Sequence, residues 1–154
     1  MRVLVIEDDR AARNALIKLL EKEGHSVCWA RSDTGITQMR REKPDLVVLD
    51  IALAEMGGWK LVWQRLNDPE LRTISTVILS GTTDDDLRSH ALASVLTGGS
   101  LVLNGPYRPE RLMSAIERLQ SKVSEIGTTA SSQSERTTSA PGETTRASAP
   151  LPEE

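Results

Sequence analysis

Acidic residues follow two short apolar segments of this chain. Asp50 ends the apolar run 46–49, and the triplet Glu7-Asp8-Asp9 follows the run 3–6. Continuous apolar runs of this kind are typical of strands in a parallel sheet that is covered on both faces. Loops at the carboxyl ends of such strands share one crevice, so carboxylates that are distant in sequence can meet there. Close carboxylates repel each other unless a hard cation lies between them, and Mg²⁺ prefers oxygen ligands. The sequence therefore predicts a metal-assisted carboxylate site.

Strand and helix patterns alternate along the chain, and the strands that they predict would carry these acids at their carboxyl ends. The apolar runs predict strands over Arg2–Ile6, Ser26–Ala30, Asp45–Leu49, Ile74–Leu79 and Leu101–Leu103. Helical spacing predicts helices over Arg10–Glu23, Asp33–Arg41, Trp59–Leu66 and Asp84–Leu96, and a last helix that begins at Pro109. Asp9 is placed to cap the first helix, and Gly24 suits its C-terminal end. Five such β–α units predict an α/β protein with a doubly wound, five-stranded parallel sheet.

Composition narrows the classes of function. The chain has 154 residues and a net charge of −3, and no basic patch is visible, so direct DNA binding is not expected. The single cysteine, Cys28, excludes an internal disulfide and a zinc site built on cysteines. It falls in a predicted strand and is interpreted as an inert core residue.

The chain divides into two regions by composition. Residues 1–126 carry the strand and helix patterns, whereas residues 127–154 are rich in Ser, Thr, Ala, Pro and Glu with almost no large apolar side chain. Such a segment cannot offset its ordering entropy and is predicted to be a disordered tail. Its role as a solubilising extension, or as a linker or docking segment, is left open. Met1 leads directly into the first strand, and no apolar stretch reaches the roughly 20 residues needed to cross a bilayer, so a soluble cytoplasmic protein is expected.

The segment from Met1 to about Glu125 resembles the receiver domain of two-component response regulators. Four motifs carry this resemblance in the family's order: the opening strand with its acids at 3–9, the strand 43–50 that ends in Asp50, Val77-Ile78-Leu79-Ser80-Gly81, and Pro106-Tyr107 before the last helix. The resemblance implies a flavodoxin-like fold with strand order 2-1-3-4-5.

The resemblance also implies roles for individual residues. Glu7 and Asp8 align with the acidic pair that binds Mg²⁺, with Asp8 favoured as the direct ligand, and the backbone carbonyl of Ala52 would be a further ligand. Asp50 aligns with the phosphoacceptor, which also contacts the metal. Ser80 aligns with the hydroxyl that binds the phosphoryl group. The lack of a side chain at Gly81 would leave room for the phosphodonor.

The function implied is that of a single-domain response regulator in a phosphorelay. Asp50 would accept a phosphoryl group from a histidine kinase or phosphotransfer protein, and the resulting phosphoprotein would signal to a downstream protein. That contact would use the face formed by the fourth helix, the fifth strand and the fifth helix. The domain would not be an enzyme beyond its own phosphorylation and autodephosphorylation.

Departures from the family pattern support an alternative. Gly105 stands where receivers carry a lysine before the Pro-aromatic pair, and Val102 replaces the usual switch aromatic. These changes are compatible with a pseudo-receiver, an interaction module that acts independently of phosphorylation. A flavodoxin-like enzyme that binds a nucleotide or flavin is a third hypothesis. The chain lacks the Walker and Rossmann phosphate-binding motifs that such an enzyme would use.

Overall fold

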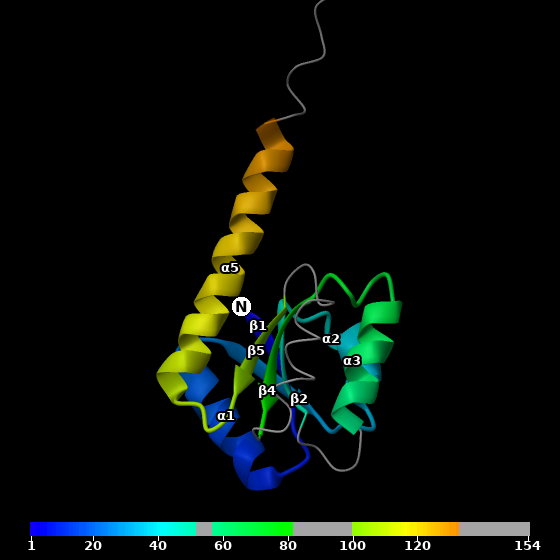
Figure 1. Cartoon of the computed structure of the whole chain (residues 1–154), viewed down its shortest axis with the longest axis vertical. Helices are drawn as coiled ribbons and strands as arrows, with labels where there is room; N and C mark the ends of the chain where they lie inside the picture. The colour runs from blue at the N-terminus through cyan, green and yellow to red at the C-terminus, as the bar shows by residue number, and fades with distance from the viewer. Residues whose placement is uncertain (52–56, 82–99, 133–154) are drawn as a thin grey trace, which may run out of the picture.

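The chain folds around one parallel sheet with helices on both faces (Figure 1). The structure is a computed structural model, and it describes residues 1–51, 57–81 and 100–132. The strands are β1 (Arg2–Ile6), β2 (Ser26–Ala30), β3 (Leu46–Asp50), β4 (Ser75–Ser80) and β5 (Ser100–Asn104). The helices are α1 (Arg10–Lys22), α2 (Gly35–Glu42), α3 (Gly57–Asn67) and α5 (Pro109–Ser132). The sheet order β2-β1-β3-β4-β5 confirms the prediction, whereas the predicted helix Asp84–Leu96 lies outside the described residues.

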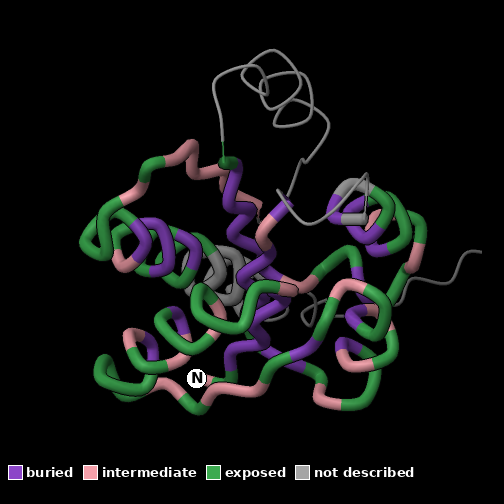
Figure 2. The backbone as a smooth tube through the Cα atoms, turned by 90° about the horizontal axis from the view of Figure 1, so that it is seen from below, coloured by how far each residue is buried: buried purple, intermediate pink, exposed green. Residues whose placement is uncertain are grey.

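Two apolar layers enclose the sheet. On one face, α1 and α5 pack on β1, β3 and β4 through Leu16, Leu20, Leu112, Ile116 and Leu119. On the other face, α2 and α3 contribute Met39, Leu61 and Val62. Figure 2 shows the buried strands at the centre, with helix surfaces exposed around them. Alternate residues of each central strand feed the two layers, which is why the runs of β1 and β3 are apolar throughout.

Local signals determine both ends of α1. The Asp9 side chain accepts a hydrogen bond from the Ala12 amide at 2.7 Å and caps the first turn, as predicted. Gly24 follows the helix with a φ of 84°, in the left-handed region that glycine adopts without strain. Because Asp9 is the N-terminal cap of α1 and β1 ends at Ile6, Glu7 and Asp8 lie in the connection between the two elements.

Helix α5 is longer than its apolar pattern predicts. It continues to Ser132, past the boundary proposed at 126, so residues 127–132 are helical rather than part of a disordered tail. Once a helix is nucleated, each added residue gains a hydrogen bond at little further cost, so residues of modest propensity can extend it. In Figure 1 this end of α5 projects beyond the sheet. The composition-based prediction for residues 133–154 falls outside the described part of the chain.

A buried arginine joins α3 to β4. Arg65 is 1% exposed, and its guanidinium donates to the carbonyl oxygens of Ile74 and, at 3.3 Å, of Arg72. Burial lowers the Arg65 pKa to about 10, so the group stays charged at neutral pH. These bonds hold the connection that precedes β4 and so help to position the strand that ends at Ser80.

Within residues 1–51, 57–81 and 100–132, no helix combines the length and apolar content needed to cross a bilayer.

Candidate functional site

The pairing of β1 with β3 brings the two predicted acidic segments together. In this parallel pair Ile6 lies opposite Leu49, so the next residues, Glu7 and Asp50, are neighbours at the carboxyl edge of the sheet. Strand β4 pairs with β3 on its other side, with Leu79 opposite Asp50. The site therefore forms where three central strands end, which is the edge that the sequence predicts.

Glu7 is a buried carboxyl group beside Asp50. It is only 3% exposed; its Oε1 accepts a hydrogen bond from the Asp9 amide at 2.8 Å, and its buried Oε2 accepts none. Burial, reinforced by contact with Asp50, raises the pKa of Glu7 to about 7. Two carboxyl groups can bond directly to each other only when they share a proton. When both are ionised, the contact requires a cation between them. The Glu7–Asp50 pair thus fits a hard divalent ion.

Asp8 is held by the connection between β2 and α2. Its Oδ1 accepts a hydrogen bond from the Ser32 amide at 2.8 Å, and its Oδ2 accepts one from the Ser32 hydroxyl at 2.6 Å. Burial raises the pKa of Asp8, but the two bonds from Ser32, together with the charges of Arg31 and Arg13, lower it overall. Asp8 is therefore an ionised group whose two oxygens already accept hydrogen bonds.

The predicted ligands do not form one preassembled cluster. Among the residues that the structure describes, no three acidic, histidine or cysteine side chains are grouped so that they could hold a metal ion. The structure brings Glu7 and Asp50 together, whereas Asp8, which sequence analysis favoured as the direct ligand, is bonded to Ser32. Ala52 lies outside the described residues. Metal binding by Asp8 would use its remaining lone pairs or require release from Ser32.

The ends of β4 and β5 complete this edge of the sheet. Ser80 is 1% exposed and lies opposite Asn104. The Gly105 amide donates to the Ser80 carbonyl at 2.6 Å, and Gly81 is exposed next to it. The Tyr107 pKa is raised by burial and by the charges of Asp50 and Glu7, which places this ring near the acidic pair. Ser80, Gly105 and Tyr107 therefore surround the end of the sheet that carries Asp50.

Sequence reasoning missed two side chains that support this edge. Ser32 lies 24 residues from Asp8, and no local spacing signals its contact. Arg13 donates to the Glu7 carbonyl at 3.1 Å, and its guanidinium lies 4.2 Å from the ring centre of Trp29. Arg13 lies four residues after the cap Asp9, so helical spacing could have placed it near the start of α1.

Known proteins share this fold. The family model of the response regulator receiver domain matches residues 3–117. Protein PilH of Pseudomonas aeruginosa is 29% identical over 116 residues, which cover 75% of this chain and 93% of PilH. The beryllofluoride-activated receiver domain of RstA from Klebsiella pneumoniae is 24% identical, with a TM-score of 0.64 over 76% of this chain and 96% of that one. A CheY-like receiver domain protein from Methanospirillum hungatei is 23% identical, with a TM-score of 0.67 over 80% of this chain and 97% of that one.

The fold and the acidic edge define a signalling domain of the two-component class. The chain belongs to the response regulator receiver domain family. This confirms the resemblance drawn from the four sequence motifs and the predicted flavodoxin-like fold.

Proposed function

We propose that this chain is a cytoplasmic receiver that accepts a phosphoryl group on Asp50 from a histidine kinase or phosphotransfer protein. The observation that supports this proposal is the contact between Asp50 and the buried Glu7 at the carboxyl edge of the sheet. Such a pair is unfavourable when both groups are ionised, so the fold retains it at a cost in stability. Catalytic and ligand-binding sites commonly carry such costs.

Asp50 would act as the nucleophile. One of its carboxylate oxygens would attack the phosphorus atom of a phosphohistidine, and the phosphorus–nitrogen bond would break as the phosphorus–oxygen bond forms. The histidine nitrogen would keep the electron pair of the broken bond. Transfers of this kind depend on positioning and on neutralising charge. Ser80, at the end of the neighbouring strand, would donate to the new phosphoryl oxygens.

Glu7 and Asp50 would hold Mg²⁺, with Asp8 and the carbonyl of Ala52 as further proposed ligands. When bound, the ion would neutralise charge between the carboxylates and the incoming phosphoryl group. The unsatisfied Glu7 Oε2 supports this assignment because a cation would supply the partner that the protein does not.

A phosphorylation-independent interaction module is the second candidate. Gly105 brings no cation to the acidic edge, and Val102 is half-buried against the apolar layer of α2 and α3. An aliphatic side chain that packs in this layer offers no evident coupling to Ser80. In either case we propose that a protein partner, rather than DNA, binds the face that includes β5 and α5.

Phosphorylation can be tested directly. Wild type and Asp50→Asn would be incubated with acetyl phosphate and Mg²⁺ and compared by intact mass spectrometry, with Asp33→Asn as the matched exposed-acid control. Wild type and Asp33→Asn are expected to gain one phosphoryl group that hydroxylamine removes, and Asp50→Asn is not. A wild-type chain that gains no labile phosphate would exclude the first candidate. Partner binding that is unchanged by Asp50→Asn and by beryllofluoride would favour the second.

A further inference from the structure

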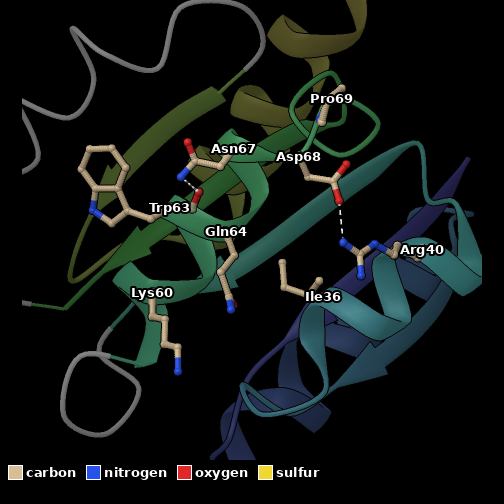
Figure 3. A pocket seen from close by; sticks show the side chains of 8 residues that line it. All are labelled: Ile36, Arg40, Lys60, Trp63, Gln64, Asn67, Asp68 and Pro69. Atoms are coloured by element: carbon tan, nitrogen blue, oxygen red, sulfur yellow. Dashed lines mark hydrogen bonds and ion pairs between the residues drawn. The ribbon is translucent and has the colours of Figure 1, made fainter.

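A groove lies between α2 and α3, on the face of the sheet opposite α1 and α5. It has a volume of about 590 Å³. Its lining residues are Ile36, Arg40, Lys60, Trp63, Gln64, Asn67, Asp68 and Pro69. Figure 3 shows Trp63 on one side, the Arg40–Asp68 pair on the other, and Ile36 and Gln64 between them. None of these residues takes part in the acidic site at the carboxyl edge.

The groove combines an exposed aromatic ring with an available cation. Trp63 is 50% exposed, although its size would favour burial in a core. Arg40 is neutralised by Asp68 at 2.7 Å, whereas Lys60 forms no ion pair with any other described residue. Aromatic grooves of this kind recognise proline-containing segments, because the rings of proline and tryptophan pack flat and the segment is already extended. The unpaired charge of Lys60 favours an acidic group next to such a segment.

The chain itself contains a segment with this chemistry. Leu151 is the only large apolar residue in 133–154; Pro150 and Pro152 flank it, and Glu153 and Glu154 follow it. We propose that this segment, Pro150–Glu154, binds the groove between α2 and α3. The prolines and Leu151 would pack on Trp63 and Ile36, and the acidic pair would lie at Lys60.

The length of the connecting chain permits this contact. Residues 133–149, which number 17, lie between the end of α5 and Pro150. That many residues can span about 60 Å when extended. A domain of roughly 125 residues has a radius of gyration of only about 14 Å. A tether of this length also gives an effective concentration on the order of 1 mM, so even a weak intrinsic affinity would suffice.

The test compares the full chain with a chain that ends at Ser132, by ¹H–¹⁵N NMR without phosphodonor. Truncation is expected to shift the Trp63 indole resonance and the amides of Gln64 and Asn67. A synthetic peptide of residues 146–154 should restore the shifts. In the full chain, Leu151→Ser should reproduce the effect of truncation, and Ala147→Ser should not. The peptide is expected to bind Trp63→Ala about tenfold more weakly. Trp29→Ala, which removes an indole that is 49% exposed away from the groove, should bind it as wild type does.

Three results would overturn the proposal. The groove resonances could be the same with and without residues 133–154. The peptide could bind Trp63→Ala as tightly as wild type. In the truncated chain the groove resonances could depend on protein concentration, which would identify a second copy of the chain as the occupant. None of these results depends on whether Asp50 is phosphorylated, so the docking proposal and the proposed function can fail separately.

Discussion

Ser32 holds both carboxylate oxygens of Asp8, one through its amide at 2.8 Å and the other through its hydroxyl at 2.6 Å. This contact ties the connection after β2 to the acidic edge of the sheet. It also keeps Asp8 ionised, because hydrogen bonds to the charged form lower a carboxyl pKa.

Ser32→Ala should therefore destabilise the protein at pH 7 by about 1.5–3 kcal/mol, the range for a hydrogen bond to a charged group. The folded pKa of Asp8 lies below its ordinary value of 3.8. The stabilisation is thus present above that value and is lost as the pH falls through the folded pKa. Urea unfolding of wild type and Ser32→Ala at pH 7 and pH 3 measures the loss in the free energy of unfolding at each pH. The control is Ser26→Ala, a substitution at an exposed serine. A Ser32→Ala deficit that is equally large at both pH values would contradict it.

Glu7→Gln should stabilise the protein at high pH. The folded pKa of Glu7, about 7, lies above its ordinary value of 4.5. The stability contributed by protonated Glu7 is therefore fully present below pH 4.5, and it is lost as the pH rises through 7. At about 1.4 kcal/mol per pKa unit, the gain from Glu7→Gln at pH 8.5 should be up to about 3 kcal/mol, with little change at pH 4. Urea midpoints measured across this range without Mg²⁺ test it. The control Glu21→Gln, at an exposed site, should show the same dependence of the urea midpoint on pH as wild type. If Glu7→Gln shows that same dependence, burial of Glu7 does not affect how stability varies with pH.

Gly105→Lys should strengthen binding of beryllofluoride with Mg²⁺. A Cβ at this position would lie 3.1 Å from the Ser80 carbonyl oxygen and 3.5 Å from that of Gly81, so a side chain fits after a small adjustment. A unit charge at about 4 Å contributes about 4 kcal/mol at an effective dielectric of 20, so at least about tenfold tighter binding is expected even after solvent screening. Titration followed by tryptophan emission measures the affinity. Gly105→Met adds a similar length without charge and should leave it unchanged; equal gains in both variants would show that charge is not the cause.

Arg65→Met should destabilise the protein by about 2–3 kcal/mol, because the carbonyl groups of Ile74 and Arg72 lose their buried donor. Methionine keeps most of the apolar volume, so the loss reports the hydrogen bonds rather than a cavity. The matched variant is Arg72→Met, whose own side chain is exposed and should change stability by less than about 0.5 kcal/mol. Chemical denaturation gives both values. An Arg65→Met protein as stable as Arg72→Met would rule out this role for the guanidinium.

Much of the fold follows from local patterns. The bounds predicted for β1 and β2 are those observed, and α1 and α5 begin at the predicted residues, Arg10 and Pro109. These elements carry strong local signals, namely apolar runs, a capping aspartate and a proline at a first helical position. The bounds of α2, β3 and α3 differ from the predicted ones by one or two residues, as is usual for element boundaries. Helix α5 runs on to Ser132, because the last turns of a helix depend on propagation rather than on a sequence signal.

The sequence by itself determined that acids end two strands of a parallel sheet, because strands are readable from apolar spacing. That these two strands are neighbours was implied only by the resemblance to receiver domains. Only the tertiary structure decided which of them meet. Burial beside Asp50 selects Glu7, and a serine 24 residues away holds Asp8. The exposed groove between α2 and α3 likewise arises from the packing of two helices that are separate in sequence. Contacts of this kind depend on side-chain direction and on distant backbone positions, and neither is encoded in local spacing.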